Sequence, residues 1–307
     1  MGVLEAIGDT PFVRLDRLRP AGGTELWVKL EAANPTGSYK DRMALAMIEG
    51  AERDGRLQPG QPVVEYTGGS TGSSLAFVCA VKGYPLKIVT SDAFAPEKLQ
   101  TMEAFGAELN VLPSPDGITP DLLPRMMERA AEIVAEVGGY PTDQFNNADM
   151  IDGYDELGVE LAEQVEGRLD AFCNYVGTAG CFLGVTRALR RSIPDVHRAV
   201  IEPGESPVIS EGRAGTHHIE GGGVGFWPPL LKEDDFDEVF AVPEAEAFAM
   251  AERAARVEGL LCGPSTGANI VVALELAKRL GPGTRVATTN VDSGLKYLAR
   301  GLDMAPD

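Results

Sequence analysis

Cysteine and histidine are scarce in this sequence, with 4 cysteines and 3 histidines among 307 residues. The cysteines lie far apart and form no Cys-x-x-Cys pair, so we expect neither a disulfide nor a zinc site. Three of them fall in apolar or glycine-rich segments, which favours reduced thiols in the core. The four positions are Cys79, Cys173, Cys181 and Cys262.

Long apolar runs and an excess of basic residues are also missing. No window approaches 18 uninterrupted apolar residues, and Met1 to Arg14 has no basic stretch followed by an apolar run, so we expect a cytoplasmic protein. There are 27 basic and 46 acidic residues, a formal net charge of −19. This charge would repel nucleic acid and anionic membranes, so neither is predicted as a partner.

Short β-branched runs alternate with helix-length amphipathic segments along the chain, whose length suits about two domains. The alternation predicts parallel sheets with helices on both faces. Two groups of strands, 60–112 and 171–290, are separated by an irregular acidic segment from Gly138 to Tyr154. We therefore expect two α/β domains with a cleft between them, and ligands at the carboxyl ends of the strands. Strands are predicted at 25–30, 62–66, 86–90, 108–112, 171–176, 198–201, 238–242 and 285–290.

One strand-to-helix junction places Lys40 at the start of a helix. The turn Asn34 to Gly37 precedes it, and the helix that follows is apolar on one side. The positive end of the helix dipole and partial burial would both favour the neutral amine that Schiff-base chemistry requires. Considered alone, however, the position still favours a surface cation.

Three further junctions place glycines and hydroxyls at helix N termini. Glu65 to Gly72 could cradle a carboxylate or phosphate, or form a tight turn with hydroxyl N-caps. Val176 to Cys181 matches neither the P-loop nor the dinucleotide motif, but its glycines would let the backbone approach a monophosphate. In Cys262 to Ala268, Ser265 alone is typical of an N-cap.

Taken together in this order, the junctions resemble those of the cysteine synthase branch of the fold-type II pyridoxal-phosphate enzymes, which includes cystathionine β-synthase. The resemblance covers nearly the whole chain. Further strings that carry it are Ile7 to Leu15, Pro35 to Arg42, Ala104 to Leu109, Gln144-Phe145, Glu202-Pro203, Ser206 to Val208, Gly223 to Phe226 and Asp292 to Leu298.

The resemblance implies a fold and a set of domains. The fold is α/β, with two three-layer domains, mostly parallel sheets and a cofactor cleft between them, as in the β subunit of tryptophan synthase. Residues 1–38 and 145–307 would form the larger, cofactor-binding domain. Residues 39–144 would form the smaller, mobile substrate domain, whose closure would exclude water.

The resemblance also implies roles for individual residues. Lys40 matches the lysine that holds pyridoxal 5'-phosphate as a Schiff base and moves the substrate's α-proton, and Ser265 matches the hydroxyl that faces the pyridine nitrogen. The phosphate would be held by Gly177, Thr178, Ala179, Gly180 and Cys181. The substrate carboxylate would be held by Thr67, Gly68, Gly69, Ser70, Thr71 and Gln144, with Ser70 also near the cofactor.

Several positions depart from the family pattern. Where relatives usually read Thr-Ser-Gly-Asn-Thr-Gly, this chain has Gly68 in place of the serine and Ser70 in place of the asparagine that would contact the cofactor 3'-oxygen. Cys181 stands where a threonine is common, and Asn146 to Asp149 differs from the usual Asn-Pro-Ala-Asn. These changes bear on substrate choice.

The leading hypothesis is therefore a cysteine synthase-like β-replacement on an activated serine such as O-acetylserine, with sulfide or another thiol as nucleophile. One rival is a β-lyase or dehydratase, or a β-replacement enzyme of specialised metabolism with another nucleophile. A second rival is a non-catalytic protein that binds pyridoxal phosphate and regulates a partner, against which an intact Lys40 speaks. The family also implies a homodimer.

Overall fold

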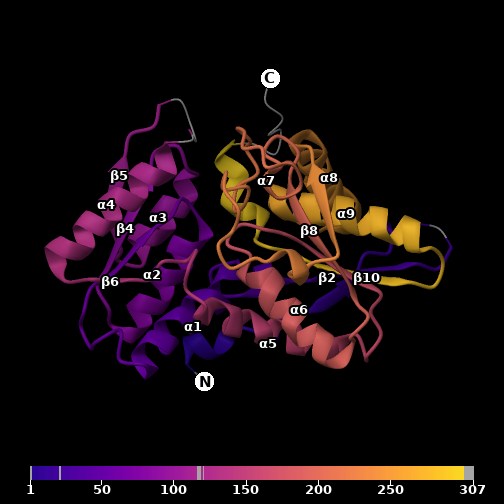
Figure 1. The fold of residues 1–307 in the computed structure, drawn as a ribbon, viewed down its shortest axis with the longest axis horizontal. Helices are drawn as coiled ribbons and strands as arrows, with labels where there is room; N and C mark the ends of the chain where they lie inside the picture. The colour runs from indigo at the N-terminus through magenta and orange to yellow at the C-terminus, as the bar shows by residue number, and fades with distance from the viewer. Residues whose placement is uncertain (1, 21, 116–118, 120, 301–307) are drawn as a thin grey trace.

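The computed structural model describes residues 2–20, 22–115, 119 and 121–300. Two sheets organise the chain, one in each half of the molecule (Figure 1). The larger sheet has the order β1-β2-β10-β7-β8-β9 and the smaller has the order β5-β4-β3-β6. An α/β fold with parallel sheets is thus confirmed, whereas the exact domain boundaries stay a prediction.

In the larger sheet every neighbouring pair is parallel except β1 with β2. Helices α5 and α6 pack on one face, and α8 and α9 cover the other (Figure 1). The strands are β1 (Phe12–Arg14), β2 (Glu25–Lys29), β7 (Ala171–Tyr175), β8 (His197–Pro203), β9 (Glu238–Val242) and β10 (Arg285–Thr289). The helices of this half are η1 (Val3–Ala6), η2 (Glu31–Ala33), α5 (Asp149–Gln164), α6 (Gly180–Ser192), α7 (Val208–Glu211), η3 (Glu233–Asp235), α8 (Glu244–Glu258), α9 (Pro264–Leu280) and η4 (Gly294–Arg300).

The smaller sheet is parallel throughout. Its strands are β3 (Val63–Tyr66), β4 (Leu86–Ser91), β5 (Glu108–Leu112) and β6 (Tyr140–Pro141). Its helices are α1 (Lys40–Arg53), α2 (Ser70–Lys82), α3 (Pro96–Ala104) and α4 (Leu122–Val137). Residues of α4 form a separate apolar cluster with Val64, Tyr66 and Val89, so this sheet too lies between helical layers.

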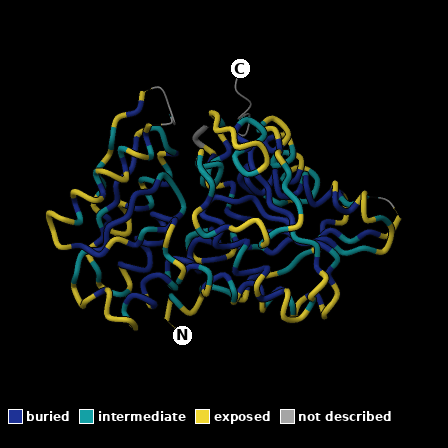
Figure 2. Tube along the Cα trace, in the orientation of Figure 1, coloured by how far each residue is buried: buried dark blue, intermediate teal, exposed yellow. Residues whose placement is uncertain are grey.

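The two halves share one continuous core. Buried side chains of α1, α2, α5 and α6 belong to a single apolar cluster that reaches both sheets. Figure 2 shows the buried segments running through both halves, with exposed residues mainly at loops and outer helix faces. Burial of this apolar area stabilises the arrangement in which α1 and α5 lie between the sheets.

The eight predicted strands lie within a residue or two of their predicted bounds, whereas β1 and β6 were not predicted. The segment from Gly138 to Tyr154 differs from the prediction, because it contains β6 and the start of α5 and is irregular only between them. The two-residue strand is too short to give a periodic pattern, and acidic Asp149 and Asp152 stand in the first turn of α5, where the helix dipole favours them. Among the described residues, none of the helices has both the length and the apolar character needed to cross a bilayer.

Candidate active site

Lys40 is the first residue of α1, and the predicted junction is confirmed. The side chain is buried, and no hydrogen bond joins its Nζ to a described residue; the ring of Tyr39 lies 5.0 Å away. Burial lowers the pKa of Lys40 to about 8, although Cys181, Asp292 and Glu65 oppose the shift. A surface position is therefore excluded, and about a tenth of the amine is neutral at pH 7, far more than for an exposed lysine with a pKa of about 10.4.

The turn before Lys40 is fixed to the segment that follows β10. The N–H of Tyr39 donates to the carbonyl of Val291 at 3.0 Å, and Ser38 forms an isolated bridge with Asp292. In the same turn Asp41 accepts two hydrogen bonds from Thr36, at 2.8 Å from its N–H and 2.5 Å from its hydroxyl. These contacts hold the start of α1 against the larger sheet.

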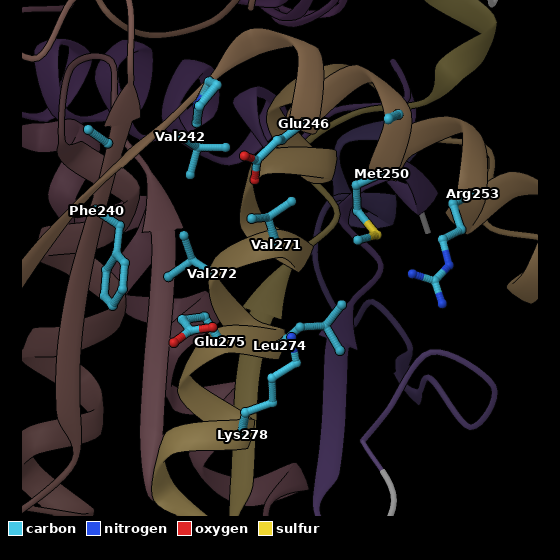
Figure 3. A pocket seen from close by; sticks show the side chains of 13 residues that line it. Phe240, Val242, Glu246, Met250, Arg253, Val271, Val272, Leu274, Glu275 and Lys278 are labelled. Atoms are coloured by element: carbon cyan, nitrogen blue, oxygen red, sulfur yellow. The ribbon is translucent and has the colours of Figure 1, made fainter.

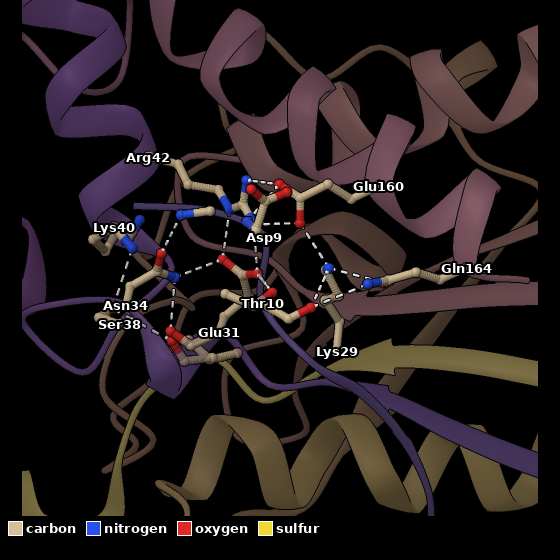
Figure 4. A network of polar contacts seen from close by, with 12 residues as sticks. Asp9, Thr10, Lys29, Glu31, Asn34, Ser38, Lys40, Arg42, Glu160 and Gln164 are labelled. Atoms are coloured by element: carbon tan, nitrogen blue, oxygen red, sulfur yellow. Dashed lines mark hydrogen bonds and ion pairs between the residues drawn. The ribbon is translucent and has the colours of Figure 1, made fainter. Parts of the chain in front are cut away.

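A buried charge network lies beside this turn (Figure 4). Arg42 donates to both oxygens of Glu31, at 2.7 and 3.0 Å, and to both oxygens of Glu160, at 2.7 and 2.9 Å. Lys29 contacts Glu160 at 2.7 Å. Two cations thus face two carboxylates, and the paired geometry offsets the desolvation of all four groups.

The loop between β3 and α2 contacts Gln144, so the residues predicted to hold the substrate carboxylate lie side by side. The Thr71 hydroxyl donates to Gln144 Oε1 at 2.9 Å, and Gln144 Nε2 donates to the carbonyl of Tyr66 at 3.1 Å. One N–H of the amide stays available for a ligand. The N-cap of α2 is Gly69, which makes no side-chain capping bond, so the alternative of hydroxyl N-caps is wrong.

Gly68 in this loop lies against an aromatic ring. A Cβ built on Gly68 would stand 2.1 Å from Cε1 of Phe94, which comes from the loop after β4. The Phe94 ring therefore fills the space that the side chain of the family's usual serine would need at position 68. Phe94 also packs against the apolar cluster that contains Phe145, the residue after Gln144.

The β7–α6 loop has the form of an anion cradle. Ala179 adopts a left-handed conformation with φ of 65°, and a Cβ on Gly177 would stand 2.4 Å from the carbonyl oxygen of Gly221. Two glycine-bearing loops are thus packed backbone to backbone. The first turn of α6 leaves N–H groups without intrahelical acceptors, and the positive end of the helix favours an anion there.

Ser265 lies in the first turn of α9. Its sequence position alone suggests an N-cap, but Ser265 does not occupy that position. The N-cap is Gly263, with Pro264 as the first helical residue. The Ser265 Oγ is buried and has no hydrogen-bond partner among the described residues. Its neighbour Thr266 accepts a 3.0 Å hydrogen bond from the N–H of Val291, so α9 begins beside the segment that also holds Tyr39.

A polar group near Ser70 was not selected from the sequence. The Ser70 hydroxyl donates to Asp292 Oδ2 at 3.2 Å, and the Tyr297 hydroxyl donates to the same oxygen at 2.7 Å. Lys98 of α3 pairs with Glu220 and lies 4.3 Å from the Tyr297 ring centroid. These contacts join the two sequence halves. The string Asp292 to Leu298 carried the resemblance, but no local spacing marked its side chains as neighbours of Ser70.

The cofactor implied by the resemblance can be tested against these observations. Within the described part of the chain, the Ser265 hydroxyl and the Lys40 side-chain amine are buried without hydrogen-bond partners, and a glycine-lined loop leads into the N terminus of α6. These features match the hydroxyl, lysine and phosphate positions that the cofactor requires. The residues present therefore fit the group. Lys40 lies near enough to Cys181 that a charge on the thiol would raise the pKa of the lysine, which places the lysine beside the phosphate loop.

A hollow in the described structure lies away from these residues. It has a volume of about 560 Å³ and lies among β9, α8 and α9, with Phe240, Met250 and Val271 in its wall (Figure 3). It contains none of the predicted site residues. A second, smaller hollow borders Gly177 and Gly223, next to the anion cradle.

Comparisons with known proteins agree with this arrangement. A family model described as pyridoxal-phosphate dependent enzyme matches residues 3–292. Cysteine synthase from Staphylococcus aureus is 39% identical over 299 residues, which cover 97% of this chain and 95% of the relative. The structure of O-ureido-L-serine synthase has a TM-score of 0.92 at 33% identity and covers 99% and 95% of the two chains. Cysteine synthase from Entamoeba histolytica has a TM-score of 0.92 at 33% identity, covering 100% and 91%.

Proposed function

Because the chain belongs to the pyridoxal-phosphate dependent enzymes, and within them to the cysteine synthase group that its motifs predicted, we propose that it catalyses β-replacement on an activated L-serine such as O-acetylserine. The incoming nucleophile is sulfide or another small thiol. The observation that carries the proposal is the buried Lys40 side-chain amine, which has a pKa of about 8 and no hydrogen bond to a described residue.

In this proposal Lys40 is both the attachment point and the proton carrier. Pyridoxal phosphate, when bound, withdraws electrons from the substrate's α-carbon and so makes its proton acidic. The free Lys40 amine removes that proton and later returns it. A pKa of about 8 suits both steps, because the amine and the ammonium are then both accessible near neutral pH.

The remaining predicted residues hold cofactor and substrate. Residues Gly177 to Cys181 would offer backbone N–H groups to the phosphate, and the Ser265 hydroxyl, which has no partner among the described residues, would face the pyridine nitrogen. A hydroxyl leaves that nitrogen neutral, which favours expulsion of a β leaving group. Thr71 and the free N–H of Gln144 orient the substrate carboxylate, with Thr67 to Ser70 beside them.

The predicted domain assignment extends the proposal to a domain movement. Residues 39–144 would move toward the rest of the chain when the amino acid binds and exclude water from the reacting centre. The Lys98–Glu220 pair, which links α3 to the loop before Gly221, would stabilise the approach. We further propose a homodimer, on the family resemblance alone, to be checked by light scattering; a cytoplasmic location stays a prediction.

A nucleophile other than sulfide is the second candidate. It is favoured by the Phe94 ring beside Gly68, which changes the surface of the loop proposed to receive the substrate. The similarity to an O-ureido-L-serine synthase shows that a protein of this fold and comparable identity bears a different product name.

Product analysis tests the proposal. Holoenzyme would be incubated with O-acetylserine and sulfide, and cysteine, pyruvate and ammonia measured. We expect cysteine from the native enzyme and none from K40A. The control is K87A, which removes a lysine on β4 that pairs with Glu108 outside the proposed site, and it should also give cysteine. Pyruvate and ammonia in the presence of sulfide would instead establish a lyase. No turnover of O-acetylserine, with cofactor bound, would overturn the proposed donor.

A further inference from the structure

Glu65, near the end of β3, is a buried carboxyl group outside the proposed chemistry. Its side chain is 1% exposed and accepts three hydrogen bonds. The donors are the Thr142 hydroxyl at 2.6 Å, the N–H of Gln144 at 3.1 Å and the N–H of Tyr66 at 2.9 Å. Three donors around one carboxylate form a fully built acceptor site, in which charge strengthens each hydrogen bond.

These donors belong to two different segments of the proposed substrate site. Tyr66 leads directly into the loop from Thr67 to Thr71, whereas Thr142 and Gln144 follow β6. Both segments are also joined through the Gln144 side chain, which contacts Tyr66 and Thr71. Glu65 thus anchors the backbone of Gln144 while the side chain of Gln144 faces the loop.

The charge of Glu65 is poised between two states. Burial and, to a smaller extent, the charge of Asp143 raise the pKa of Glu65 to about 7. The hydrogen bonds from Thr142, Tyr66 and Gln144 act in the opposite direction. The other titratable groups that sense its charge are Tyr66, Tyr140 and Lys40. Asp143 and Tyr140 lie on the β6 side, Tyr66 on β3 and Lys40 on α1.

We propose that Glu65 is a positioning residue for Gln144. The ionised form of Glu65 holds the two carboxylate-binding segments in register, and protonation of Glu65 loosens them. Protonation turns one acceptor oxygen into a hydroxyl and removes the charge from all three hydrogen bonds. The inference rests on the proposed function insofar as Gln144 receives the α-carboxylate of an amino acid.

The test is amino-acid binding to the holoenzyme as a function of pH. L-alanine has the α-carboxylate but no leaving group, so the change in cofactor absorbance reports its Kd without turnover. We expect E65Q to raise this Kd about tenfold at pH 8, equivalent to the loss of about 1.4 kcal/mol. The ratio of the E65Q Kd to the native Kd should shrink toward one below pH 6, because native Glu65 is then protonated.

Two variants complete the experiment. T142V removes the hydrogen bond that most lowers the pKa of Glu65, so it should move the midpoint of the pH profile upward and remains informative if E65Q fails to fold. E156Q changes another carboxyl group with a raised pKa, on the far helix α5, and should leave the profile unchanged.

Each outcome bears on one claim. An E65Q-to-native ratio that is constant with pH, together with an unmoved T142V midpoint, would overturn the positioning role. Native enzyme that binds L-alanine with the expected pH profile but does not consume O-acetylserine would leave this inference standing and remove the proposed reaction. Equal effects of E65Q and E156Q would also count against Glu65.

Discussion

The ring of Phe94 occupies the space beside the α-carbon of Gly68, where a Cβ would stand 2.1 Å from its Cε1 atom. The φ of Gly68 is not in the left-handed region, so the backbone itself does not demand glycine there. The ring does. Any side chain at this position must displace Phe94 from the loop that follows β4.

The first prediction is that G68S is destabilising while Phe94 is present. Overpacking of this kind costs about 1–3 kcal/mol in the free energy of unfolding, measured by urea denaturation. The variant should also bind L-alanine more weakly, because the ring must move within the proposed substrate loop.

The double variant G68S/F94A supplies the control. Removing the ring makes room for the serine, so the two changes should be coupled by at least about 1 kcal/mol, with the double variant more stable than the sum of the singles predicts. Strict additivity would show that the loop relaxes without cost, and would remove Phe94 as the reason for glycine.

The second prediction concerns the pH dependence of cofactor capture. Burial lowers the pKa of Lys40 to about 8, so the reactive amine increases as pH rises through that value. The rate at which apoenzyme forms its lysine-bound cofactor should increase with the same midpoint, followed by visible absorbance. A midpoint near that of an exposed lysine, about 10.4, would contradict the burial of Lys40. K40A should retain no cofactor after borohydride reduction.

The third prediction separates the folding and binding roles of Ser265. Its buried Oγ makes no hydrogen bond to any residue that the structure describes, so S265A should change the unfolding free energy of the apoprotein by less than about 0.5 kcal/mol. Cofactor affinity should fall about two- to tenfold. Thr266 is the matched control, because its hydroxyl is bonded to Val291 and Asn290. T266V should destabilise the apoprotein by about 1–3 kcal/mol. A large loss of apoprotein stability in S265A would show that Oγ has a structural partner.

Local sequence patterns predicted most of the fold and the first residue of α1. Short β-branched runs between helical patterns located eight of the strands, and the place of Lys40 at the start of a helix followed from the strand-turn-helix order. The patterns could not show that Ser70 meets Asp292, since 222 residues separate them and only the folded chain brings them together. Considered alone, Ser265 is typical of an N-cap, because hydroxyls favour that position, but the N-cap is Gly263, two residues earlier, and Pro264 is the first helical residue.

The roles of Glu31, Arg42 and Glu160 were beyond sequence reasoning for a related reason. Charged residues are expected on the surface, and only the three-dimensional pairing allows Arg42 to be buried between two carboxylates. Arg42 lies two residues after Lys40, so this pairing fixes the first turn of α1 on which Lys40 depends. The motif contained the arginine, but not its partners.

The fourth prediction is that E160Q destabilises the protein and changes its response to acid. Burial raises the pKa of Glu160, but hydrogen bonds and charges from Arg42 and Lys29 outweigh it and lower the pKa to about 2. The stability that Glu160 provides is therefore complete above its unfolded pKa of about 4.3 and is lost as pH falls toward 2. Removing one partner leaves Arg42 and Lys29 facing a single carboxylate, at a cost of about 3–5 kcal/mol at pH 7.

Urea denaturation at pH 7 and pH 3.5 checks both parts, with E156Q on the same helix as control. The native protein and E156Q should lose stability between the two pH values, and E160Q should lose less, because its amide does not titrate. Equal acid losses in all three proteins would assign the acid sensitivity to other carboxylates. The charges of Lys29 and Arg42 balance those of Glu31 and Glu160, and none of these four is among the groups that shift the pKa of Lys40. E160Q should consequently weaken the support of α1 while the pH midpoint of cofactor capture stays where Lys40 sets it.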